Sequence, residues 1–151
     1  MLANDIKQTK SFRSEHHKVL VNIQLTNFWI LEQVKSIIEN ENITYQQYNI
    51  LCILRNSIIP LSTKELSKRM LDKMSDTSRL IDRLVLKGLA EKKMSMIDKR
   101  LVDISITQKG MEVLEAIDEH NEKIDKITEN LSTEELQLLN RFLDNLHSAE
   151  N

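Results

Sequence analysis

The spacing of apolar residues predicts a mostly helical chain. Apolar side chains recur at helical spacing between Val19 and Ile38, which predicts one long amphipathic helix over about residues 7–39. Its apolar surface is wider than one stripe, so this helix is expected to contact more than one neighbour. Shorter helices are expected over residues 44–59, 62–70 and 75–87, the first of them ending before Pro60.

Local sequence signals support these boundaries. Three helix starts have the spacing of a capping box, in which a hydroxyl and a side chain three residues later bind exposed backbone amides. The three pairs are Thr44 with Gln47, Ser62 with Glu65, and Ser132 with Glu135. Gly88 stands where a left-handed residue is expected to end the helix of residues 75–87.

After Gly88 the apolar period changes from that of a helix to that of a strand. Residues 102–106 alternate apolar and polar side chains, which predicts a strand, and residues 89–94 are a weaker candidate for its partner. Thr107 is expected to cap a further helix. Apolar residues then follow at coiled-coil-like spacings: Ile117, Ile124, Ile127 and Leu131. The helix after Ser132 carries one apolar face.

Composition agrees with a helical chain and adds an uneven charge distribution. The 151 residues include only two Gly and one Pro, and the formal net charge is −2. Residues 61–110 contain 12 Lys and Arg against 7 Asp and Glu, whereas the remainder contains 9 against 16. A basic middle between acidic ends favours a polyanion-binding face, although a solvated surface with no partner explains the same counts.

The sequence lacks the signals of several other classes of protein. No secretory signal is visible, the longest apolar run (residues 50–54) is too short to cross a membrane, and Cys52 is the single cysteine. The chain is therefore expected in the cytoplasm. Gly88 and Gly110 cannot build a glycine-rich phosphate loop, and no zinc-protease pattern or nucleophile elbow is present. We expect no enzyme, no catalytic or metal site and no cofactor.

The predicted helix of residues 75–87 has two contrasting faces when unrolled at about 100° per residue. Its expected buried face contains Met74, Thr77, Leu80, Ile81, Leu84 and Val85, and its exposed face contains Ser75, Asp76, Ser78, Arg79, Asp82 and Arg83. Arg side chains can bind guanine in a major groove, and Ser hydroxyls can reach phosphates or bases. The two acids would repel phosphate unless they pair with Arg or accept from a cytosine amine. An ordinary amphipathic surface helix would carry similar residues.

The order of elements favours the DNA-binding interpretation. A short capped helix, a tight turn, a second helix and a basic hairpin are the parts of a winged helix. The hairpin carries four cations: Lys92, Lys93, Lys99 and Arg100. Arg100 is expected in a narrow minor groove, where the negative potential is enhanced. For the lysines, protection of an exposed strand edge is an equally good explanation.

Three stretches of sequence resemble the MarR family of bacterial regulators. They are Leu61-Ser62-Thr63-Lys64-Glu65-Leu66, then Ser78-Arg79-Leu80-Ile81-Asp82-Arg83-Leu84 with Lys87-Gly88-Leu89, and finally Asp98-Lys99-Arg100 with the strand that leads to Thr107-Gln108-Lys109-Gly110. Leu71 stands where a Gly is common in the family, and residues 74–76 are an unusual start for the recognition helix. DNA specificity therefore does not transfer from better-known members.

The resemblance implies a fold, a partner and roles for individual residues. The fold would be mainly α, a winged helix-turn-helix with a small hairpin wing and long terminal helices that form a homodimer. Ser75, Asp76, Ser78, Arg79 and Arg83 would contact DNA in the major groove, and Lys99 and Arg100 would contact it from the wing. Asp98 would brace the wing through an ion pair, and residues 59–61 would form a short strand beside the hairpin.

The interpretation that follows is a homodimeric repressor that binds a pseudo-palindromic operator in double-stranded DNA. A small-molecule effector would release it, and Phe28, Trp29, Tyr45 and Tyr48 are candidates for the pocket, although core packing explains these aromatic residues as well. Residues 1–40 and 111–151 would form the dimer and residues 41–110 would bind DNA, within one compact domain. The alternative is a helical adaptor whose winged helix binds protein.

Overall fold

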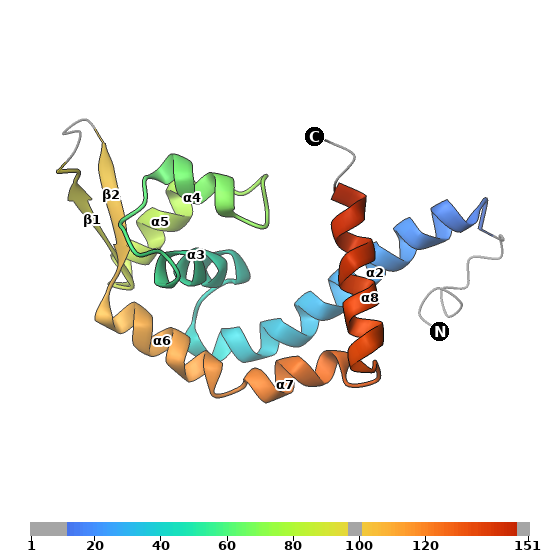
Figure 1. Ribbon diagram of the computed structural model, residues 1–151. Helices are drawn as coiled ribbons and strands as arrows, with labels where there is room; N and C mark the ends of the chain where they lie inside the picture. The colour runs from blue at the N-terminus through green and yellow to red at the C-terminus, as the bar shows by residue number, and fades with distance from the viewer. Residues whose placement is uncertain (1–11, 97–100, 148–151) are drawn as a thin grey trace. The chain divides into compact units, whose positions relative to one another are not determined.

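The computed structural model describes residues 12–96 and 101–147 and divides the chain into two compact units (Figure 1). The first unit ends at Glu119 and the second begins at His120. The first unit contains the helices and the hairpin that were predicted to bind DNA. The fold is mainly helical with one two-stranded antiparallel sheet, as the sequence predicts.

Helix α2 runs from Glu15 to Ile38 and starts later than the sequence pattern indicated. The predicted start near residue 7 lies outside the described residues, but residues 12–14 are described and are not helical. Ser14 has an extended backbone and its hydroxyl accepts a hydrogen bond from the amide of His17, so this residue caps the helix. The apolar periodicity begins only at Val19, inside the helix, and therefore does not locate the start of the helix. A short 3-10 turn, η1 (Glu39–Glu41), follows α2.

Three helices follow: α3 (Tyr45–Arg55), α4 (Thr63–Arg69) and α5 (Thr77–Leu86). The capping boxes predicted at Thr44 and Ser62 are both present. Helix α5 begins two residues later than predicted, with Asp76 as its cap. Figure 1 shows α3, α4 and α5 grouped beside the hairpin.

The hairpin is formed by β1 (Ala90–Met94) and β2 (Val102–Ile106), in the register that pairs Ala90 with Ile106 and Met94 with Val102. Gly88 joins α5 to β1 with a φ of +73°, the left-handed conformation expected of it. The strand predicted over residues 59–61 is reduced to a single bridge, in which Leu61 and Ile104 exchange both backbone hydrogen bonds at 3.0 and 2.9 Å.

The core of the first unit lies between these elements. Side chains from α3, α4, α5, β2 and α6 are completely buried, among them Ile50, Leu51, Leu66, Ile81, Leu84, Ile104 and Leu114. Burial of this many Leu and Ile side chains is the main contribution to the stability of this unit. Because α5 and the hairpin both pack on this core, the exposed face of α5 and the hairpin belong to one folded unit.

Helix α6 (Gln108–Asp118) starts directly on the base of the hairpin. The Thr107 hydroxyl accepts from the amide of Gly110 and donates to the carbonyl of Gly88 at 2.7 Å. A Cβ at Gly110 would lie 2.2 Å from the carbonyl oxygen of Leu89, so only Gly fits. At its other end, α6 is joined to α3 by an ion pair between Arg55 and Asp118, 2.5 Å apart.

The second unit contains α7 (Asn121–Asp125), the short turn η2 (Lys126–Thr128) and α8 (Thr133–His147). The coiled-coil-like run from Ile117 to Leu131 is therefore not one continuous helix. The capping box at Ser132 is present. In the part of the chain that is described, no helix is long and apolar enough to cross a membrane.

Candidate nucleic-acid interface

Helix α5 presents the two faces that the sequence predicts. Thr77, Ile81 and Leu84 are buried, and Ser78, Arg79, Asp82 and Arg83 are exposed. Arg79 and Arg83 are four residues apart, so they lie along the outermost line of the helix. Met74 is a correction: it was expected on the buried face, but it precedes the helix and is 93% exposed.

Ser75 and Asp76 also lie outside the helix, in the turn before it. The Ser75 hydroxyl donates to a carboxylate oxygen of Asp72 at 2.6 Å, and the amide of Met74 donates to the other oxygen of Asp72 at 3.0 Å. These two hydrogen bonds, that from Ser75 first, lower the pKa of Asp72. Asp72 was not among the predicted site residues, although an Asp whose side chain binds the backbone amide two residues later is a common feature of turns.

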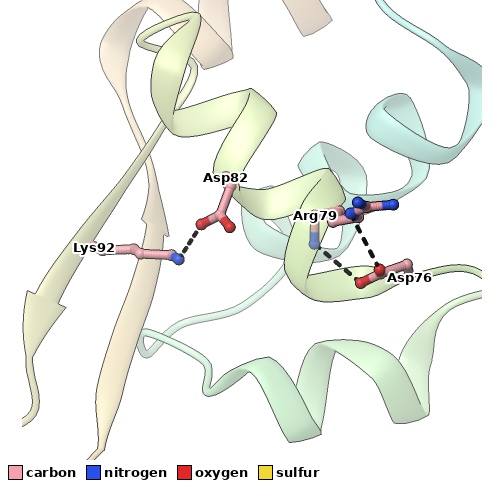
Figure 2. A network of polar contacts seen from close by, with 4 residues as sticks. All are labelled: Asp76, Arg79, Asp82 and Lys92. Carbon is pink, nitrogen blue, oxygen red and sulfur yellow. Dashed lines mark hydrogen bonds and ion pairs between the residues drawn. The ribbon is translucent and has the colours of Figure 1, made fainter.

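Asp76 serves as the N-cap of α5. One carboxylate oxygen accepts from the amide of Arg79 at 3.1 Å, and the other lies 3.7 Å from the Arg79 guanidinium (Figure 2). A carboxylate at this position binds an otherwise free amide and interacts favourably with the positive end of the helix dipole. The acid that begins α5 is thereby paired with the arginine next to it.

Asp82 is paired as well, with a residue of the hairpin. Its carboxylate forms an ion pair with the ammonium group of Lys92 in β1 (Figure 2). The side chain of Arg83, in contrast, forms no hydrogen bond or ion pair with any described part of the chain. The exposed face of α5 thus combines two paired acids with an arginine whose side chain has no partner among the described residues.

The two lysines of β1 lie on opposite faces of the hairpin. Lys93 pairs with Glu91 at 2.7 Å, and this ammonium group lowers the pKa of the Glu91 carboxylate. The hydroxyl of Ser105 also donates to Glu91 across the strands at 3.2 Å. Lys99, Arg100 and Asp98 lie outside the described residues, so the minor-groove contacts and the bracing ion pair stay predictions.

A cavity of about 280 Å³ lies between α2 and α3, and it includes one of the four predicted pocket residues. Its walls are formed by Leu31, Lys35, Ile38, Glu39, Ile43, Thr44, Tyr45 and Gln46. Phe28 is 68% exposed and Trp29 is 37% exposed, and neither lines the cavity. Tyr48 packs beside Tyr45, with ring centroids 6.3 Å apart, but is not a wall residue either.

Cys52 lies one helical turn from Tyr48 and shares its surroundings. Burial raises the pKa of the Cys52 thiol, and burial together with Cys52 raises the pKa of Tyr48 to about 12. The thiolate is therefore disfavoured, which agrees with the interpretation of Cys52 as a packing residue. Among the described residues, no group of three or more His, Cys, Asp or Glu side chains could hold a metal ion.

A capped helix, a turn, an exposed second helix and an adjoining hairpin define a winged helix-turn-helix protein. The family model described as the MarR family matches residues 43–102, which span α3 to the start of β2. The resemblance to the MarR family predicted from the sequence is confirmed. A search of curated proteins finds no match.

Solved structures with the same fold cover most of the chain. A MarR variant from E. coli in complex with operator DNA is 24% identical, with a TM-score of 0.79 over 91% of this chain and 99% of that chain. BpsR of Bordetella bronchiseptica, whose DNA binding is regulated by 6-hydroxynicotinic acid, is 19% identical, with a TM-score of 0.77 over 86% and 93%. The organohalide-sensing regulator RdhR, bound to 2,4-dichlorophenol, is 19% identical, with a TM-score of 0.82 over 95% and 88%.

Proposed function

We propose that the chain is a sequence-specific DNA-binding regulator that acts in the cytoplasm as a homodimer, without catalytic activity. The observation that carries this proposal is the exposed face of α5, where Arg79 and Arg83 project outward beside a basic hairpin and the nearby acids are paired. Such a face can enter a major groove with little repulsion from phosphate. The operator complex of the similar E. coli protein supports the same use of the fold.

The apolar faces of α2 and α8 support a second copy of the chain as partner. Val19, Leu20 and Phe28 are 45–68% exposed on α2, and Leu139, Phe142 and Leu146 are 43–55% exposed on α8. Water contact with so many large apolar side chains is unfavourable, and pairing of identical helices would remove it. A two-fold dimer presents two copies of α5, so its operator should be a pseudo-palindrome with half-sites ~10 bp apart.

The test is selection of DNA from a random duplex pool with the purified protein. An enriched pseudo-palindrome is expected, and Arg83→Ala should weaken binding to it by ~10-fold or more, the loss typical of an arginine that reads a base. Arg13→Ala, which removes the same charge before α2, is the matched control and should bind normally. Enrichment of no sequence by a folded dimer would overturn the proposal. Binding that ignores salt would point instead to a protein-binding adaptor.

The proposed regulator is a repressor that a small aromatic molecule releases from DNA. The cavity between α2 and α3 has room for about one ring, and Lys35 at its wall, which pairs with Glu39 at 3.4 Å, can exchange this partner for an acidic group of a ligand. Similar proteins were solved with a dichlorophenol and studied with a hydroxylated nicotinic acid, which supports this chemical class. Titration of 6-hydroxynicotinic acid and 2,4-dichlorophenol against the protein–operator complex should release DNA, and Tyr45→Ala should weaken that release. Retention of DNA at saturating concentrations of both compounds would count against effector control by this class.

A further inference from the structure

The hairpin is held to the rest of the first unit by buried side chains at its base and by the backbone bridge between Leu61 and Ile104 of β2. On the face that turns toward α5, Ala90 is 2% exposed and Ile104 is completely buried. Further out on the same face, at the last pair of the register, Met94 and Val102 are 66% and 45% exposed. Lys92 lies between Ala90 and Met94 on this face of β1, opposite Ile104 in the register of the sheet. On this face, the outermost pair of the sheet is therefore more exposed than the pairs nearer the base, and Lys92 lies where this change begins.

Lys92 makes such a contact with the helix that precedes the hairpin. Its ammonium group pairs with the carboxylate of Asp82, and the two side chains bridge β1 and α5 (Figure 2). Asp82 lies on the same line of the helix as Ser78, next to the line of Arg79 and Arg83. The ion pair thus joins the exposed face of α5 to the point where the hairpin leaves the core.

We propose that Lys92 is a positioning residue for DNA binding, a role that rests on the proposed function. By pairing with Asp82 it fixes the direction of the hairpin relative to α5, so that helix and hairpin meet neighbouring grooves together. It also neutralises a carboxylate that would otherwise repel a phosphate beside Ser78. Lys92 acts through Asp82 and makes no phosphate contact of its own.

Lys92 and the neighbouring Lys93 differ in the exposure of their side chains and in the face of the hairpin on which they lie. The Lys92 side chain is 36% exposed and faces α5, whereas the Lys93 side chain is 69% exposed and lies on the opposite face, paired with Glu91. Both side chains carry one positive charge at adjacent positions of the same strand. Lys93→Gln is therefore the matched control for Lys92→Gln, because it removes the same charge and leaves Asp82 paired.

The experiment is a double-mutant cycle on operator affinity with the full-length protein. Lys92→Gln should weaken binding by ~5-fold, the upper end for one exposed ion pair, while Lys93→Gln changes it by less than ~2-fold. In the Asp82→Asn background, Lys92→Gln should cost less than ~2-fold, because no unpaired carboxylate remains. The slope of log affinity against log salt should stay the same in Lys92→Gln, whereas loss of a phosphate contact would reduce it by ~0.9. Thermal melting of each variant checks that the fold is intact.

The outcomes separate this proposal from the proposed function. Failure of the wild-type protein to select any operator overturns the proposed function. Normal operator binding with equal losses for Lys92→Gln and Lys93→Gln overturns the role of Lys92 alone. An undiminished loss in the Asp82→Asn background, or a reduced salt slope, would instead identify Lys92 as a direct phosphate contact.

Discussion

The winged helix and helix α8 differ in how far their apolar side chains are exposed. In α3, α4, α5 and β2 the large aliphatic side chains that point inward are almost completely buried by neighbours in the same chain. In α8 an apolar stripe of similar composition is 38–55% exposed. The winged helix buries its apolar side chains within the same chain, whereas the apolar stripe of α8 stays exposed. Substitutions in the first should therefore change folding, and substitutions in the second should change assembly.

The largest effect is expected from a charge on the exposed stripe of α8. Phe142→Glu would place an unpaired carboxylate in the proposed dimer interface, which should shift the protein to monomers and weaken operator binding by ~100-fold. Sedimentation velocity and DNA titration measure the two effects. Gln137→Glu adds the same charge to the opposite side of α8 and should leave the dimer intact. A wild-type chain that sediments as a monomer would contradict a role of the α8 stripe in assembly.

The next effect concerns the buried core. Leu66 in α4 is completely buried, so Leu66→Ala should lower the free energy of unfolding by ~3 kcal/mol, the usual cost of such a cavity. Leu86 in α5 is 88% exposed, and Leu86→Ala should change the free energy of unfolding by less than ~0.5 kcal/mol. Urea denaturation gives both values. Equal losses at the two positions would show that exposure does not separate the roles of these leucines.

A smaller effect is expected at the start of α5. Asp76→Ala removes the cap and should cost ~1 kcal/mol of unfolding free energy, while Asp76→Asn keeps an acceptor and should cost less. The same denaturation measurement compares the two variants. If both variants keep full stability and both lose DNA affinity, Asp76 is a DNA contact, as first predicted, and its cap is unimportant.

The smallest effect concerns Tyr48. Its pKa is raised to about 12 from an ordinary value of 10.0, so the folded state holds this proton more tightly than the unfolded state. Stability from this group is therefore intact below pH 10 and is lost as the pH rises from 10 to 12. The chain has two Tyr residues, and an absorbance titration near 295 nm of Tyr48→Phe should lack the late part of the wild-type curve. An unchanged curve would contradict the shift.

Much of the secondary structure in both units could be predicted because its signals are local. Capping boxes at Thr44, Ser62 and Ser132, the left-handed Gly88 and the alternation over residues 102–106 each depend on neighbouring residues, and all are present in the structure. The start of α5 was predicted two residues early because Ser75 and Asp76 fit both the exposed face of a helix and the turn before it. Periodicity does not separate these two uses.

Contacts between distant segments could not be predicted from spacing. The ion pair of Asp82 with Lys92 and that of Arg55 with Asp118 join residues 10 and 63 positions apart, and no local pattern selects these partners. The cavity includes Tyr45 but excludes Phe28, because the direction of a side chain on α2 depends on how that helix packs. The exposed and buried faces of α5 were recovered, since they depend only on the helical period.

The junction at Thr107 and Gly110 has a mechanical consequence. The base of the hairpin and the first turn of α6 share hydrogen bonds and a contact too close for any side chain at Gly110, so the two cannot rotate independently. Eleven residues of helix make a rigid rod of ~16 Å that ends at Asp118. A change in the direction of α6 would therefore also change the direction of the hairpin, because the two elements are joined rigidly at Thr107 and Gly110.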